Sequence, residues 1–165
     1  MMNHLYVVFV CLSCTLIGCD EFPKDTHHTL QHIQSRGVLR IGAIDQAPWA
    51  YREEGVAKGI EIKLAVAFAR SLGAEPQVEF LSEADATEYL RQHQIDLMVG
   101  GLTNASPRKD ELGLTRNYFQ TGDEQTYEHV LAVPKGENGF LVRLETFLKQ
   151  QQDRIQQLWE AESRA

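Results

Sequence analysis

Three histidines near the start of the chain have the spacing of a possible metal site. His28 and His32 are four residues apart, so on a helix their rings would lie on one face and could share a metal ion, with His27 beside them. No acid or cysteine stands at a fixed spacing from them, and a solvated polar helix face explains the same pattern. We therefore expect no metal site and no cofactor.

Catalytic residues are not set out in any recognisable order. The sequence has no serine in a strand–turn–helix elbow with histidine and acid partners, and no glycine-rich phosphate loop after a strand. The sequence therefore predicts a protein that is not an enzyme.

The cysteines point to a covalent lipid. Leu5 to Gly18 is an apolar run with the length of a signal-peptide core, too short to cross a bilayer comfortably. It ends in Leu16-Ile17-Gly18-Cys19, which looks like a bacterial lipobox, and the other two cysteines fall inside the segment that would be removed. We expect residues 1–18 to be a lipoprotein signal peptide, Cys19 to carry the lipid and residues 19–25 to be a short tether. A buried N-terminal helix is the alternative, because Met1 to His4 contains no Lys or Arg.

The residue after the expected lipid site bears on localisation. By resemblance to proteobacterial lipoproteins, Asp20 is the signal that avoids sorting to the outer membrane. The expected location is the periplasmic face of the inner (cytoplasmic) membrane, where several acyl chains would make the anchoring stable.

Composition and charge describe an ordinary folded domain. The 165 residues include 16 Lys plus Arg and 23 Asp plus Glu, a formal net charge of −7, with 43% hydrophobic residues. This balance argues against nucleic acid as a partner, because binding the phosphate backbone needs a concentrated positive face. No apolar run of twenty residues and no internal repeat is present, so we expect one domain and no multi-pass membrane protein.

Apolar periodicity predicts the elements that would position a site. A first helix is expected over 27–35, capped by Asp25 or Thr26 and ended by Gly37. There follow a strand over 38–43, a helix over 60–72, a strand over 77–81, a helix over 84–93 and a strand over 95–100. This order predicts an α/β fold with a parallel sheet and right-handed crossovers. A fourth strand over 128–134 and one long helix from Phe140 to about Ala161 complete the prediction.

Several short motifs now stand in a recognisable order. They are Leu39-Arg40-Ile41-Gly42, Ala47-Pro48-Trp49-Ala50-Tyr51, Lys58-Gly59-Ile60-Glu61-Ile62, Gln94-Ile95-Asp96-Leu97, Gly101-Leu102-Thr103-Asn104-Ala105-Ser106-Pro107-Arg108 and His129-Val130-Leu131-Ala132-Val133-Pro134. In this order the chain resembles the amino-acid-type extracellular solute-binding proteins of family 3. The resemblance implies one lobe of a type II periplasmic-binding-protein fold, with strand order about 2-1-3-n and the strand over 128–134 antiparallel.

The second lobe of that family has no counterpart in the sequence. Family members leave lobe one near the position of Tyr118, build a second α/β lobe and return. Here only residues 119–128 join the two halves of lobe one, enough for a loop or a hairpin. We expect residues 26–165 to form a single solute-binding-protein-like lobe. The relatives also place a glycine near Gln151 between two helices; this chain has none, which favours one continuous helix.

The resemblance implies a set of ligand contacts. Arg108 matches the arginine that holds the ligand carboxylate, Thr103 the residue that adds hydroxyl and amide donors, and Gly101 the backbone that approaches the ligand. Asp45 lies near an acidic position of some members, and Trp49 and Tyr51 could supply an apolar wall. Two of these residues have an alternative, purely structural role: Arg108 could pair with Asp110 or Glu111 on the surface, and Trp49 could belong to the core.

A lone lobe would bind weakly. A charge-assisted hydrogen bond contributes about 1.5–3 kcal/mol in a closed site but only about 0–1 kcal/mol open to water. The first hypothesis is therefore that an amino acid or similar carboxylate ligand is recognised together with a second wall, supplied by an inner-membrane transporter, channel, antiporter or sensor, or by a second copy of the chain. The alternative is an accessory or regulatory subunit that has lost ligand binding and contacts only protein. A third reading is a truncation product without function.

Overall fold

Short apolar strands build the central sheet of the computed structural model, which describes residues 24–122 and 125–162. The five strands run in the order β4-β1-β5-β9-β6. They are β4 (Glu75–Phe80), β1 (Val38–Ala43), β5 (Leu97–Val99), β9 (Ala132–Pro134) and β6 (Leu112–Leu114). β1 pairs in parallel with β4 and β5, and β9 pairs antiparallel with β5 and β6. The predicted α/β lobe with order 2-1-3-n is confirmed, and β6 adds an unpredicted edge strand.

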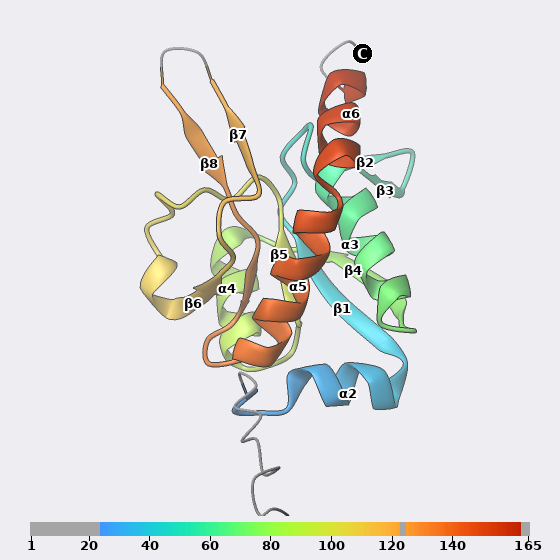
Figure 1. The fold of residues 1–165 in the computed structure, drawn as a ribbon, viewed down its shortest axis with the longest axis vertical. Helices are drawn as coiled ribbons and strands as arrows, with labels where there is room; N and C mark the ends of the chain where they lie inside the picture. The colour runs from blue at the N-terminus through green and yellow to red at the C-terminus, as the bar shows by residue number, and fades with distance from the viewer. Residues whose placement is uncertain (1–23, 123–124, 163–165) are drawn as a thin grey trace, which may run out of the picture.

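Helices cover both faces of this sheet, so that the central strands β5 and β9 are buried on both sides. α3 (Ile60–Ser71) and α5 (Asn138–Gln150) enclose one core, which includes Ile41, Leu97 and Phe68. α4 (Glu83–Arg91) encloses the other, around Leu90 and Met98 (Figure 1). The first helix, α2 (Thr29–Arg36), ends at Gly37 as predicted, with this glycine in the left-handed region at φ 68°.

The start of α2 is capped from a distance. His28 precedes the helix without a side-chain cap, and Glu137 instead accepts hydrogen bonds from the backbone N–H groups of His27 (2.8 Å) and Thr29 (3.0 Å). Asp25 accepts from the N–H of Leu30 at 3.0 Å and also caps α5. The predicted cap residue Asp25 therefore ties two helix starts together, one of them more than a hundred residues away in sequence.

Two hairpins rise beside the sheet. β2 (Tyr51–Glu53) pairs with β3 (Val56–Lys58), and β7 (Phe119–Thr121) pairs with β8 (Tyr127–His129). The single strand predicted over 128–134 is wrong, because β8 and β9 are separate strands. Between them the N–H of Val130 donates to Leu102 O, and that of Leu131 donates to the Thr115 hydroxyl at 3.0 Å. The chain thus passes from the hairpin to the main sheet at these two residues.

The long C-terminal helix is also interrupted. α5 ends at Gln150 and α6 (Gln152–Glu162) begins two residues later, although no glycine separates them. The side chain of Gln152 donates to the backbone carbonyls of Leu148 (3.2 Å) and Tyr118 (3.3 Å), which fixes the break against the neighbouring segment. The expected single helix is therefore two helices with a tertiary contact at their joint.

The predicted signal peptide, the lipid site Cys19 and the sorting residue Asp20 lie outside the described residues. Among the helices that the structure describes, none combines the length and the apolar character that a membrane span requires.

Candidate functional site

The carboxyl ends of β1 and β5 lie side by side, and the loops that leave them form one edge of the lobe. The N–H of Ile44, just after β1, donates to Val99 O at 2.8 Å. Ligands of open parallel sheets characteristically bind outside this edge. We refer to the loops 44–50 and 100–108 together as the carboxyl edge.

A buried carboxylate holds the carboxyl edge together. Glu61, in the first turn of α3, is fully buried, and its Oε2 accepts hydrogen bonds from the N–H groups of Gly100 and Gly101, the latter at 3.1 Å. Its Oε1 accepts from the Tyr118 hydroxyl at 2.6 Å. Burial raises the pKa of Glu61 against the lowering effect of these three donors. Burial, then the charge of Glu61, raises the pKa of Tyr118 well above its usual value.

Gly101 is required by its packing. Its φ is +71°, and a Cβ built there would lie 2.4 Å from Cδ1 of Trp49. The close approach that the structure shows at Gly101 is therefore to Trp49, while the predicted approach to a ligand stays a prediction.

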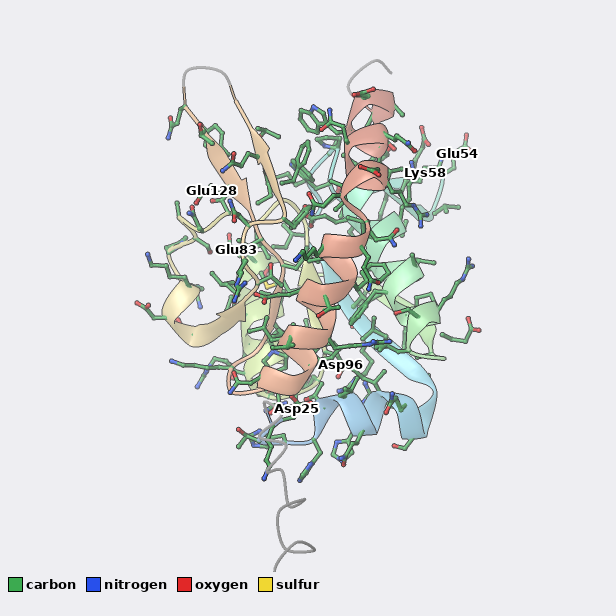
Figure 2. The ribbon with its side chains drawn as sticks, in the orientation of Figure 1. Asp25, Glu54, Lys58, Glu83, Asp96 and Glu128 are labelled. Atoms are coloured by element: carbon green, nitrogen blue, oxygen red, sulfur yellow. The ribbon has the colours of Figure 1, made fainter. Side chains whose placement is uncertain are left out.

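Two of the predicted ligand residues line one pocket. Gly101 and Thr103 lie in the wall of a hollow of about 240 Å³ at the carboxyl edge. The remaining wall residues are Ile44, Gln46, Glu83, Gly100, Leu102, Ala105, Ser106 and Pro107. The carboxylate of Glu83 accepts from the Ser106 hydroxyl at 3.2 Å and is the only charged group in this wall. Figure 2 shows Glu83 on the side of the lobe that carries the β7–β8 hairpin.

Arg108 lies one residue beyond this wall. It precedes the 3-10 turn η1 (Lys109–Glu111) and is exposed. Within the described residues no ion pair joins it to Asp110 or Glu111; the Glu111 carboxylate instead pairs with Arg91, at 3.9 Å. The guanidinium thus forms no ion pair with the acids that follow it in sequence. Arg108 follows the last wall residue of the pocket but does not line the pocket itself.

The other predicted contacts are dispersed. Asp45 is exposed on the loop after β1. Tyr51 lies on β2, where its hydroxyl donates to Glu162 of α6 at 3.2 Å. Lys63 donates to the same carboxylate at 2.6 Å, so both residues secure α6. The structure does not bring Asp45 or Tyr51 into the wall of the pocket.

Trp49 lies in an aromatic cluster that covers it. Its ring stacks on Trp159 of α6 at 5.5 Å between centroids, lies 3.9 Å from the ring of His129 and meets Phe119 edge-on at 6.2 Å. Only 4% of Trp49 is exposed. In this arrangement Trp49 is a core residue at the carboxyl edge.

His129, the last residue of β8, contacts the carboxyl edge and was not predicted as a site residue. Its backbone forms a bridge with Thr103, and its Nε2 lies 2.8 Å from the Thr121 hydroxyl. Its Nδ1 is buried and has no hydrogen-bond partner among the described residues. Burial lowers the pKa of His129 to about 4, so the imidazole is neutral. Nothing in the pattern around His129 distinguishes it in the sequence.

These groups can bind a small polar ligand by hydrogen bonds and charge. The pocket offers hydroxyls, backbone groups and one carboxylate, with a guanidinium nearby. In the part of the chain that the structure describes, no three His, Cys, Asp or Glu side chains are placed to hold a metal ion.

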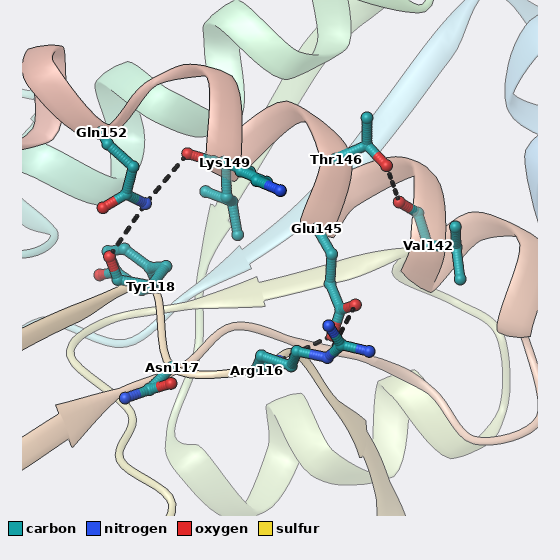
Figure 3. A pocket seen from close by; sticks show the side chains of 9 residues that line it. Arg116, Asn117, Tyr118, Val142, Glu145, Thr146, Lys149 and Gln152 are labelled. Carbon is teal, nitrogen blue, oxygen red and sulfur yellow. Dashed lines mark hydrogen bonds and ion pairs between the residues drawn. The ribbon is translucent and has the colours of Figure 1, made fainter.

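A larger hollow lies elsewhere. It has a volume of about 450 Å³ and runs between α5 and the segment 116–118 (Figure 3). Its polar rim includes Arg116, whose backbone N–H donates to the Glu145 carboxylate at 2.8 Å. It contains none of the predicted ligand residues, so size alone does not identify the site.

Comparison with known proteins identifies relatives of the whole lobe. Membrane-bound lytic murein transglycosylase F of Aeromonas hydrophila subsp. hydrophila is 27% identical over 141 residues, which cover 82% of this chain and 28% of that protein. The arginine-binding extracellular protein ArtP of Bacillus subtilis is 24% identical over 116 residues, covering 70% of this chain and 43% of ArtP. The chain thus spans 28% and 43% of the length of these two relatives.

Solved structures agree with this lobe. The arginine-bound form of domain 1 from TmArgBP superposes with a TM-score of 0.66 and 27% identity, covering 72% of this chain and 97% of that domain. Residues 39–160 match the model for bacterial extracellular solute-binding proteins, family 3. Since this match includes most of its length, the chain belongs to the bacterial extracellular solute-binding proteins, family 3.

Proposed function

We propose that the chain is a membrane-anchored periplasmic solute-binding-like lipoprotein. It recognises an amino acid or a similar carboxylate ligand at the carboxyl edge, together with an inner-membrane transport or sensing partner. The observation that carries this proposal is the pocket in which Gly101 and Thr103 lie together, with the exposed side chain of Arg108 next to it in sequence.

Arg108 is the residue assigned to the ligand carboxylate. Its planar guanidinium can donate two parallel hydrogen bonds to a carboxylate, and its exposure leaves it able to turn toward the pocket. Open to water, such a pair contributes about 0–1 kcal/mol, and a closed site would raise this to about 1.5–3 kcal/mol. Affinity of the chain alone is therefore in the millimolar range at best, which corresponds to about 4 kcal/mol.

Cationic amino acids are the ligand class best supported. ArtP is named as an arginine-binding protein, and the solved domain 1 of TmArgBP is an arginine-bound form. In this chain Glu83 lines the pocket, and Asp45 is exposed on the adjoining loop outside the pocket wall. A carboxylate held by Arg108 and a cationic group facing Glu83 would match this distribution of charge.

A partner protein would close the site. The carboxyl edge lies below the β7–β8 hairpin and α6, which extend beyond the sheet at the same end of the lobe (Figure 1). A transporter, channel, antiporter or sensor, or a second copy of the chain, could pack against these elements. A lipid at Cys19 with Asp20 as the retention signal would hold the chain at the inner membrane and raise its effective concentration near such a partner.

Titration calorimetry of the full-length chain in detergent tests ligand recognition. L-Arginine, L-glutamine and L-glutamate are titrated into the wild type and into the Arg108→Ala and Lys109→Ala variants. Lys109 is an exposed cation next in sequence, so Lys109→Ala removes the same charge without removing the assigned contact. Millimolar heat that Lys109→Ala retains and Arg108→Ala loses supports the proposal. Equal binding by all three proteins would show that Arg108 holds no ligand.

One observation favours the alternative function. The aromatic cluster covers Trp49 with side chains of the chain itself, so the wall expected to face a ligand is occupied. An accessory or regulatory subunit that contacts only protein would need no open wall. Absence of heat with every amino acid, in the presence as well as the absence of a partner, would favour this alternative.

We propose binding without catalysis. The transglycosylase relative is an enzyme, but this chain matches only 28% of its length.

A further inference from the structure

A second cluster of ionisable side chains lies at the end of the lobe opposite the carboxyl edge. Four histidines and two arginines surround a hollow of about 450 Å³, which we call the base hollow: His27, His28, His32, His93, Arg36 and Arg40. Its lining includes His32 and Arg36 of α2, the helix that Figure 1 shows at the end of the lobe farthest from the β7–β8 hairpin. No function proposed for the carboxyl edge uses these residues.

The two arginines are held in place by one acid. Asp96, with 3% of its side chain exposed, accepts from Arg40 Nη2 at 2.9 Å and from Arg40 Nε at 3.3 Å, and it pairs with Arg36 Nη2. Arg36 Nε also donates to Val38 O at 2.9 Å. Neither Nη1 group makes a hydrogen bond to any described residue, and both side chains are 31% exposed. Each guanidinium is therefore fixed in orientation while part of its donor set faces water.

The histidines make the charge of the base hollow depend on pH. With the histidines neutral, Arg36 and Arg40 are balanced by Asp96 and by Glu137, whose carboxylate lies 3.3 Å from His27 Nδ1, so the cluster has no net charge. Protonation of the four histidines adds up to four positive charges. The rings of His27 and His93 lie 4.1 Å apart, and burial followed by the charge of His27 lowers the pKa of His93.

The surrounding charges do not offset this gain. Lys24 and Asp25 at the start of the described chain are of opposite sign. The adjoining hollow, which shares His27 and His93, adds two bases and two acids: Arg91, Lys135, Asp110 and Glu111. The base of the lobe thus has no net charge while its histidines are neutral and becomes cationic once they bind protons, although the whole chain carries −7.

The base hollow lies close in sequence to the expected lipid site Cys19, and this position indicates the class of ligand. Only five residues lie between Cys19 and Asp25, so the six steps from one to the other span at most about 20 Å. If Cys19 carries a lipid, as in the proposed function on which this step rests, the base hollow lies within reach of the headgroups. Phospholipid phosphates accept from guanidinium and imidazolium donors. We propose that the base hollow binds the phosphate of an anionic phospholipid once its histidines are protonated, so that the lobe stands on the membrane with its carboxyl edge outward.

Histidine titration by NMR tests this proposal on the full-length chain. The chain, labelled with ¹³C at histidine Cε1, is reconstituted into nanodiscs of phosphatidylcholine alone, of phosphatidylcholine with 30% phosphatidylglycerol, or of phosphatidylcholine with added inorganic phosphate. Binding of an anion to the protonated form must raise the histidine pKa values. We expect phosphatidylglycerol to raise those of His28 and His32 by about half a unit or more, and to leave His129 at the opposite end unchanged.

Two variants separate a built site from a general surface potential. Arg36→Gln removes one guanidinium, while Arg40 still pairs with Asp96, so folding is preserved. Lys58→Gln removes an equal charge at the far end of the lobe, where Figure 2 places Lys58. The phosphatidylglycerol effect should shrink at least twofold in Arg36→Gln and persist in Lys58→Gln.

Each contrary outcome is distinct. Equal titration in all discs, or an effect that Arg36→Gln leaves intact, overturns the site. A rise with inorganic phosphate and none with phosphatidylglycerol overturns the membrane assignment. A chain that does not stay in the discs contradicts the anchor of the proposed function, whereas a retained chain with flat titration contradicts the base hollow alone.

Discussion

Replacement of Glu61 gives the sharpest stability prediction. In the folded chain three donors depend on this carboxylate: the N–H groups of Gly100 and Gly101 and the hydroxyl of Tyr118. Each buried donor left without an acceptor costs about 1–3 kcal/mol, so Glu61→Ala should lower the free energy of unfolding by about 3 kcal/mol or more. Glu61→Gln keeps an oxygen for the two amides and removes a buried charge, so its cost should be about 1 kcal/mol.

Urea unfolding of the three proteins, followed by tryptophan fluorescence, measures both values. Glu79→Ala, at an exposed acid of β4, serves as the control and should change the free energy of unfolding by about 0.5 kcal/mol or less. A loss in Glu61→Ala no greater than in Glu61→Gln would refute the reasoning, because it would show that the three donors do not depend on the acceptor.

The same residue predicts a pH dependence with a definite sign. The pKa of Glu61 is raised in the folded state above its usual 4.5, so the folded chain binds the proton more tightly than the unfolded chain. Stability from this group is fully present below pH 4.5 and is lost as the pH rises through the folded pKa. In Glu61→Gln this fall with rising pH should disappear.

Other substitutions test the remaining contacts of the carboxyl edge. Gly101→Ala should lower the free energy of unfolding by about 3 kcal/mol, since a Cβ there meets Trp49 at 2.4 Å in a left-handed backbone; Gly73→Ala, at φ +72° with nothing within 4 Å, should cost only about 1 kcal/mol in the same urea titration. His129 has its pKa lowered from 6.5 to about 4, so stability from its neutral form is present above pH 6.5 and is lost as the pH falls toward 4. That loss, at most about 3 kcal/mol, should be absent in His129→Gln, and a wild type and variant with parallel pH profiles would contradict it.

The elements with strong local signals could be predicted from sequence. Val38–Ala43 and Ile60–Ser71 follow from continuous apolar runs and helical spacing, and Gly37 marks the end of α2. The short strands β2, β3 and β6 were not predicted, because three residues give too little periodicity and their pairing depends on distant partners. The break between α5 and α6 was missed for the same reason: the Gln152 side chain fixes it through Tyr118 O, a tertiary contact.

The candidate site was predictable only where it follows the family motifs. Gly101 and Thr103 share a pocket, and Arg108 adjoins it. Glu61 could have been singled out as an acid at the start of an otherwise apolar helix, yet only the fold shows that its three hydrogen-bond donors come from two distant segments. The covering of Trp49 by Trp159 joins residues 110 positions apart, which no local pattern reveals.

The central claim is that a small carboxylate ligand binds at the carboxyl edge, and amide chemical-shift mapping tests it most directly. L-Arginine is titrated into the ¹⁵N-labelled full-length chain in detergent micelles. We predict saturable shifts, in the millimolar range, concentrated at residues 100–108 and lost in Arg108→Ala. Shifts confined to the α5 hollow around Arg116, or no shifts anywhere at concentrations that saturate a millimolar site, would contradict the account.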